Sequence, residues 1–135
     1  MKIARKESTL VATATEVFDH PAFYIMSLIN TYAAIKVHRD FWLTEREKEF
    51  FVALIISQNE GIKDFKSQEA RPIFDFYFGK HRKGTRGDYV KRLEDKGWLE
   101  QFGGDVKLLP LFENLDLDSD ESVFEVKYKI RKDDD

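Results

Sequence analysis

The stretch between residues 86 and 101, RGDYVKRLEDKGWLEQ, constrains the fold of this chain more than any other segment. Val90 and Leu93 lie three residues apart, so both fall on one face of a helix while charged residues occupy the other faces. Gly97 is typical of a helix end, because glycine readily adopts the left-handed conformation that turns the chain sharply. The Trp-Leu pair that follows is expected to begin a strand packed against the core. The segment therefore predicts a helix, a sharp turn and a strand in close succession.

Two further helices are predicted upstream of this segment. Thr44 and Glu47 have the spacing of a capping box, and a stripe of Phe, Leu and Ile follows, so we expect a helix from there to Gly61. Pro72 can open a short helix that runs through Phe78, and the next residue is a glycine that can close it.

The connection into the basic helix concentrates positive charge. Between Lys80 and Arg92 there are six Lys or Arg residues and one Asp, although the whole chain has a net charge of −3. Thr85 and Asp88 resemble a second cap pair at the start of the helix. Because the distribution of charge matters more than its sum for a local contact, this segment is a candidate for binding an anionic partner.

Beyond the Gly103-Gly104 pair the pattern changes from helical to extended. Residues 106–112 are typical of a strand, and Pro110 favours an edge position. Residues 123–130 alternate apolar and polar side chains, as in a strand with one wet face. Between them, Glu113–Glu121 holds five acidic residues and no basic one. These two strands are predicted to pair as a long hairpin with an acidic tip.

The first 42 residues are predicted to form a strand-like arm and an apolar helix. Residues 9–18 mix β-branched and small residues with partial alternation, which favours a strand. Pro21 suits the first position of a helix, and the following segment is apolar almost all round as far as Ala34, as in a buried or interfacial helix. We expect an α+β protein in which residues 1–42 serve packing or oligomerisation and residues 43–135 form a second domain with an acidic tail.

Residues 43–130 resemble the winged helix-turn-helix proteins of the MarR-like type. In that family the recognition helix ends in Leu, charged residues, Lys-Gly and two hydrophobic residues, which here are Leu93, Glu94-Asp95 and Lys96-Gly97-Trp98-Leu99. The resemblance implies a winged helix-turn-helix fold and binding to double-stranded DNA. The acidic tip of the predicted wing and the arm and helix before residue 43 depart from the minimal pattern of the family.

The resemblance also implies roles for individual residues. The N-terminal part of a recognition helix enters the major groove, and here that part comprises Arg86, Gly87, Tyr89, Val90 and Lys91. Phosphate contacts would come from Lys80, Arg82, Lys83 and Arg92. We expect a non-enzymatic DNA-binding protein that regulates transcription or replication and self-associates through the 21–42 helix.

Catalytic and metal sites have no support in the sequence. The chain has no cysteine, which excludes disulfides, thiolate nucleophiles and Cys-ligated zinc. The histidines at 20, 38 and 81 lack the spacing of three or four residues that a metal site on one helix requires. Neither a Gly-rich phosphate loop nor a serine nucleophile motif occurs. We expect no enzymatic activity, no cofactor and no metal.

Two short motifs are better explained as ordinary surface. Asp116, Asp118 and Asp120 alternate as at the start of a calcium loop, but Glu121 stands where the loop requires glycine. Arg86-Gly87-Asp88 spells an adhesion tripeptide, yet the N-terminus has no signal-peptide character. No apolar run approaches the ~18 residues of a membrane span. We therefore expect a cytoplasmic protein, or alternatively a component of a virion.

The alternative hypothesis is a structural or scaffolding subunit of a large assembly such as a virus particle. The net negative charge, the apolar helix and the strand-like arm favour it. The aromatic content of 14% is also high for one winged helix, and aromatic residues are enriched at the centres of protein interfaces. In that case the winged helix would act as a packing module, and the basic segment would meet a protein neighbour.

Overall fold

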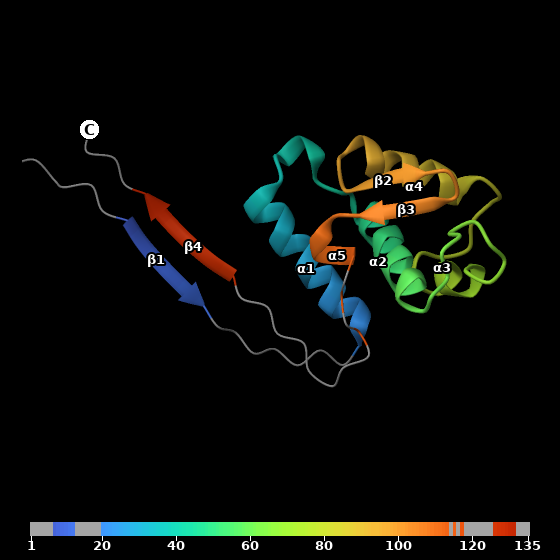
Figure 1. Ribbon diagram of the computed structural model, residues 1–135, viewed down its shortest axis with the longest axis horizontal. Coiled ribbons are helices and arrows are strands. Elements are labelled where there is room, and N and C mark those ends of the chain that lie inside the picture. Colours follow the sequence, from blue (N-terminus) through green and yellow to red (C-terminus); the bar gives the residue numbers. More distant parts are fainter. Residues whose placement is uncertain (1–6, 13–19, 114, 116, 118–125, 132–135) are drawn as a thin grey trace, which may run out of the picture. The chain divides into compact units, whose positions relative to one another are not determined.

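The computed structural model describes residues 7–12, 20–113, 115, 117 and 126–131, the two strands at 7–12 and 126–131 by their backbone only. The chain divides into two compact units, one made of Met1–Val17 with Asp118–Asp135 and the other of Phe18–Leu117. Each unit holds one pair of antiparallel strands (Figure 1).

The smaller unit brings the two ends of the chain together. Strand β1 (Glu7–Ala12) pairs antiparallel with β4 (Val126–Arg131), so that Glu7 lies opposite Arg131 and Ala12 opposite Val126. The prediction of a strand near the N-terminus is confirmed for residues 9–12, while 13–18 lie outside the described residues. The prediction that the C-terminal strand belongs to the wing is wrong, because β1 is its partner.

The described residues of the larger unit form five helices, one 3-10 turn and a two-stranded hairpin (Figure 1). Its elements in chain order are α1 (Pro21–Lys36), η1 (Arg39–Phe41), α2 (Glu45–Asn59), α3 (Arg71–Tyr77), α4 (Thr85–Asp95), β2 (Leu99–Phe102), β3 (Asp105–Leu108) and α5 (Pro110–Glu113). Helix α2 contacts α1, α3 and α4, and α4 contacts β2. The protein is therefore α+β, and this order of elements is compatible with a winged helical fold.

The observed hairpin is shorter than predicted and lies earlier in the chain. Strand β2 pairs with β3, with Leu99 opposite Leu108 and Phe102 opposite Asp105. Gly103 has a φ of 61° at the first of the two turn positions, where a tight hairpin favours glycine. A two-residue turn closes at a small entropic cost, which favours this pairing over one across the acidic link. Pro110 opens α5 instead of ending an edge strand.

Capping residues and a proline explain where α1 and α2 begin. Thr44 and Glu47 form the predicted capping box, with both reciprocal hydrogen bonds present. His20 Nδ1 accepts from Ala22 N at the start of α1, and Pro21 occupies the first turn. The predicted Thr85 and Asp88 cap is wrong, because Gly84 occupies the N-cap of α4 and no side chain caps it. Thr85 is instead the first residue of that helix.

The core of the larger unit is aromatic. Trp98 is 1% exposed, and its ring centroid lies 5.4 Å from that of Tyr32, 5.8 Å from Phe51 and 6.1 Å from Phe112. Leu93 and Leu99 are also buried, so the predicted burial of these three residues is confirmed. Trp98 thus contacts rings from α1, α2 and α5 at once.

Helix α1 belongs to the same unit as the helices that follow it. Ile25, Leu28, Ile29 and Ala33 are buried, and the helix contacts α2. The expected boundary at residue 42 therefore coincides with neither limit of this unit. Helix α1 ends at Lys36, earlier than predicted, and the 3-10 turn η1 follows. Within the described residues, no helix has the length and apolar character that crossing a membrane requires.

Truncating Trp98 should test the aromatic core. Trp98→Ala should lower the free energy of unfolding by about 3–5 kcal/mol, because the cavity would lie between three elements. Trp98→Phe should cost less, since it keeps a ring but removes the indole N–H that donates to Phe41 O at 2.8 Å. Urea unfolding followed by circular dichroism measures both values. An alanine variant within about 1 kcal/mol of the wild type would contradict this view of the core.

Candidate nucleic-acid interface

Helix α4 has one buried face and one charged face. Arg86, Val90 and Leu93 are buried, and their spacing places them on one side of the helix. The exposed residues of the opposite side are Asp88, Lys91, Arg92 and Asp95. The outer face of α4 therefore carries two basic and two acidic side chains, and its own charges cancel.

Most of the positive charge lies in the turn before α4. Lys80, Arg82 and Lys83 are exposed there, while the side chain of His81 between them is only 3% exposed. His81 Nδ1 lies 2.9 Å from Gly79 O and 3.5 Å from the carboxylate of Asp75. The ring of His81 therefore anchors the turn from inside, which nothing in the sequence around it indicates.

Arg71 also holds this turn. Its guanidinium donates to His81 O at 3.1 Å, and its Nε lies 3.8 Å from a carboxylate oxygen of Asp75. The ring of His81 also makes edge contacts with Phe74 and Phe78. The turn is thus tied to α3 by one arginine and one histidine, which leaves its exposed cations pointing away from that anchor.

Arg86 serves the interior rather than the outer face. It is 8% exposed, and its guanidinium donates to Phe65 O at 2.7 Å and to Ser67 O at 2.9 Å. Burial lowers the pKa of Arg86, the charge of Arg71 lowers it further, and Asp75 and Asp64 oppose that shift. The prediction that Arg86 enters a DNA groove is wrong, because its donors already bind carbonyl groups of the α2–α3 connection.

Tyr89 and Val90 also contact the core rather than the outer face of α4, where a base contact would be made. The Tyr89 ring stacks on Phe50, with centroids 5.4 Å apart, and meets the Phe78 ring edge-on at 4.8 Å. Val90 is fully buried. On the outside, the guanidinium carbon of Arg92 lies 4.5 Å from the Tyr89 ring centroid. Tyr89 therefore connects the aromatic core to the guanidinium of Arg92.

One exposed basic residue near α4 is missed by sequence reasoning. A Cβ atom added at Gly87 would lie 3.4 Å from Cε of Lys66 and 3.7 Å from its Nζ, so this lysine crosses the first turns of α4. Lys66 belongs to the polar α2–α3 connection, where neither spacing nor composition marks it as different from Lys63. Only the fold brings it beside the basic turn.

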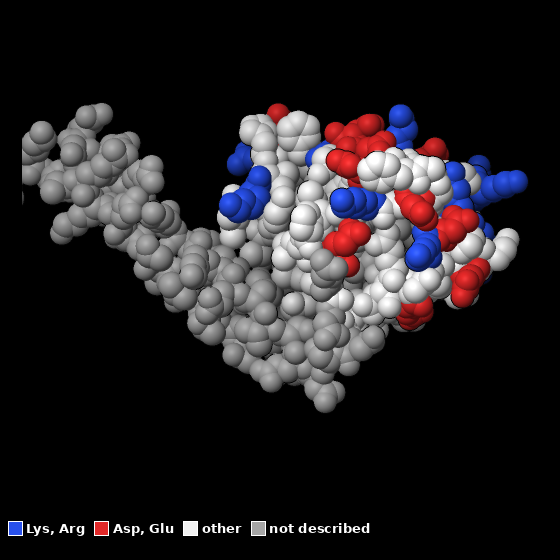
Figure 2. All heavy atoms as spheres, viewed as in Figure 1, with Lys and Arg blue, Asp and Glu red and all other residues white. Residues whose placement is uncertain are grey.

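The rest of the surface is mixed in charge. Figure 2 shows Lys and Arg interspersed with Asp and Glu on the face in view, without one continuous basic surface. On the hairpin, Glu100 and Asp105 are exposed, and Glu100 lies opposite Lys107. Near α4, the exposed positive charge without adjacent acids is that of the turn before the helix, with Lys66 close to Gly87.

A buried ion pair fixes the far end of α4. Lys96 Nζ lies 2.5 Å from Glu47 Oε1 and donates to Trp42 O at 3.1 Å. Burial would raise the pKa of Glu47, but the hydrogen bond and charge of Lys96, with the hydrogen bonds of Thr44, outweigh it and lower that pKa. Glu47 is therefore charged at neutral pH and connects the start of α2 with the end of α4.

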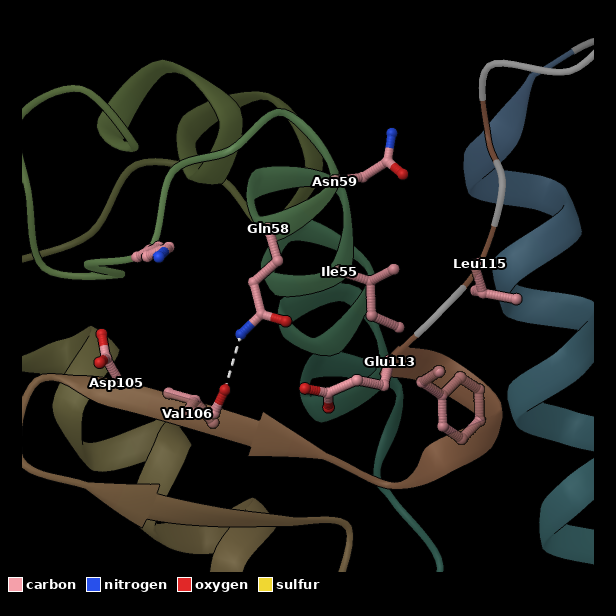
Figure 3. Close-up of a pocket in the computed structure, with 9 residues that line it drawn as sticks. Ile55, Gln58, Asn59, Asp105, Val106, Glu113 and Leu115 are labelled. Atoms are coloured by element: carbon pink, nitrogen blue, oxygen red, sulfur yellow. Dashed lines mark hydrogen bonds between the residues drawn. The ribbon is translucent and has the colours of Figure 1, made fainter.

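A cavity of about 340 Å³ lies between α2, β3 and α5 (Figure 3). Gln58 Nε2 donates to Val106 O at 3.0 Å across it, and Glu113 accepts from Leu108 N at 2.8 Å. Figure 3 shows Asn59 pointing away from these groups. None of the lining residues belongs to α4, so the cavity is separate from the basic region. Among the described residues, no group of His, Asp and Glu is arranged to hold a metal ion.

Five of the nine residues to which the resemblance assigns DNA contacts are exposed at the turn or on α4. These five are Lys80, Arg82, Lys83, Lys91 and Arg92, while Arg86 and Val90 are buried and Gly87 and Tyr89 are half-buried. Comparison of the chain with protein-family models, curated proteins and solved structures finds no match. The geometry of the described residues therefore carries the functional argument.

The Glu47–Lys96 pair should make stability depend on pH. Because the pKa of Glu47 is lowered on folding, its contribution is present above the ordinary value of 4.5 and is lost as the pH falls below it. Glu47→Gln keeps a side chain able to complete the capping box but removes the charge. It should cost about 1–3 kcal/mol at pH 7. Urea unfolding between pH 7 and 3 should show the two proteins converging, and a constant difference would contradict the assignment.

Arg86 should affect stability more than any exposed cation of α4. Arg86→Met keeps an unbranched apolar side chain but leaves Phe65 O and Ser67 O without their donor, so it should cost about 2–4 kcal/mol. The matched control is Lys91→Ala on the outer face, which should change stability by no more than about 0.5 kcal/mol. Equal effects of the two substitutions in urea unfolding would show that Arg86 is not the internal anchor described above.

Proposed function

We propose that this protein is a winged helix-turn-helix protein that binds double-stranded DNA and acts in transcription or replication control without catalysis. The observation that carries the proposal is the set of exposed cations at the start and on the outer face of α4. Lys80, Arg82 and Lys83 precede the helix, and Lys91 and Arg92 follow on the side opposite its buried stripe. A basic region of this kind is the usual electrostatic footprint of DNA binding.

The arrangement of elements supports the same proposal. Helices α2, α3 and α4 precede the β2–β3 hairpin in the order of a winged helix-turn-helix, with α4 as the recognition helix. The hairpin differs from a phosphate-binding wing, since Glu100 and Asp105 are exposed beside its turn. DNA would therefore be bound chiefly through α4 and the turn that precedes it.

The salt dependence of binding provides a quantitative test. Neutralising one phosphate contributes a slope of about −0.9 to the plot of log affinity against log salt, so five contacts would give about −4.5. Arg82→Ala and Lys83→Ala should each flatten the slope by about 0.9 and weaken binding to all duplexes alike. Fluorescence anisotropy with a labelled duplex at several salt concentrations measures both the affinity and the slope.

A matched control is available on another helix. Lys36 is exposed at the end of α1, so Lys36→Ala removes the same charge outside the basic region and should leave the slope unchanged. An equal effect of Lys36→Ala would indicate a response to net charge alone. No binding at low salt, where phosphate contacts are strongest, would remove the proposal.

Exposed aromatic residues favour a second candidate function, in which the protein is a packing subunit of a large assembly. Phe76 is 76% exposed, Phe23 64% and Phe102 59%. Aromatic side chains are enriched at the cores of protein interfaces, so these exposed rings are candidate contact points. In that case Phe76→Ser would reduce the self-association measured by light scattering. Arg82→Ala and Lys83→Ala would impair assembly, and the wild-type protein would not bind duplex DNA.

A further inference from the structure

Recognition of a DNA sequence requires side chains that can reach base edges from the start of the recognition helix. The most selective contacts are bidentate hydrogen bonds from Arg to guanine and from Asn or Gln to adenine. Helix α4, which the structure describes in full, contains neither Asn nor Gln, and its two arginines are Arg86 and Arg92. Readout of guanine by this helix would therefore depend on those two arginines and on Lys91.

Neither arginine is placed to read a base. Arg86 donates to two backbone carbonyl groups in the interior, at 2.7 and 2.9 Å. The guanidinium carbon of Arg92 lies 4.5 Å from the Tyr89 ring centroid, a distance at which the cation is attracted to the ring face. Tyr89 itself is held between Phe50 and Phe78. Arg86 is thus used in the interior of the protein, and the guanidinium of the exposed Arg92 lies against the Tyr89 ring.

Two acidic side chains on the outer face of α4 oppose close approach of the helix to the floor of the major groove. Asp88 is exposed one turn into α4, where a major-groove helix lies closest to the DNA. Lys91 is exposed between Asp88 and Asp95, which share its side of the helix by their spacing of three and four residues. A single lysine can contribute at most one base contact, against the several that a specific site needs.

The cations around the helix start are suited to phosphate instead. Lys80, Arg82 and Lys83 are exposed in the turn, and Lys66 lies across the first turns of α4 at Gly87. These side chains come from two connections that flank the helix. We infer that the site binds the phosphate backbone of duplex DNA and does not distinguish sequences, an inference that rests on the proposed function.

Selection from a random library tests this inference. The full chain is incubated at low salt with duplexes that contain a randomised centre, and the bound fraction is sequenced before and after several rounds. We expect the bound pool to match the input, and individual duplexes of unrelated sequence to bind within about tenfold of one another. A sequence bound more than about tenfold better than the rest overturns the inference but leaves DNA binding intact. No binding at low salt removes the proposed function and this inference together.

Asp88→Ala provides an independent test that does not disturb the core, because Asp88 is exposed. If α4 meets only phosphates, removing this exposed acid should strengthen binding to every duplex by the same factor, about two- to fivefold at low salt. Lys66→Ala should weaken every duplex equally and flatten the salt slope by about 0.9. If Asp88 instead accepts a hydrogen bond from cytosine, Asp88→Ala would alter the ranking of duplexes, which would overturn the inference.

Discussion

The packing of the larger unit depends on the interactions of the Glu47 carboxylate. It accepts from Thr44 N at 2.8 Å and lies 2.5 Å from Lys96 Nζ, which also donates to Trp42 O. One buried charge therefore determines where α2 begins, where α4 ends and how the segment before α2 crosses that end. Burying a carboxylate without such partners would cost several kcal/mol, so the burial of Glu47 depends on these contacts.

Arg86 has the corresponding position at the opposite end of α4. Its hydrogen bonds to Phe65 O and Ser67 O satisfy carbonyl groups in a connection that has no regular helix or strand to pair them. Helix α4 is thus anchored at its start by a buried arginine and at its end by a lysine in an ion pair. These anchors hold the helix rigidly, and its outer face contributes little to that rigidity.

The same anchoring limits what the outer face can do. A guanidinium used inside the protein is not available to a ligand, and the aromatic core extends to Tyr89, directly beneath Arg92. What remains at the surface is a set of exposed cations near exposed acids. Such a surface attracts a polyanion by charge, but it presents few fixed donors to distinguish one ligand from another.

Features with local causes could be predicted from the sequence by itself: the capping box at Thr44, the start of α1 at Pro21, the end of α4 at Gly97 and the burial of Trp98. Each depends on residues within one helical turn or on apolar character. Only the tertiary structure decided that β4 pairs with β1 and that Arg86 turns inward. The amino-acid sequence does not indicate which backbone carbonyl groups will lack a backbone hydrogen-bond donor in the fold. An arginine that donates to such a carbonyl group therefore cannot be distinguished, from the sequence, from one that would bind a phosphate.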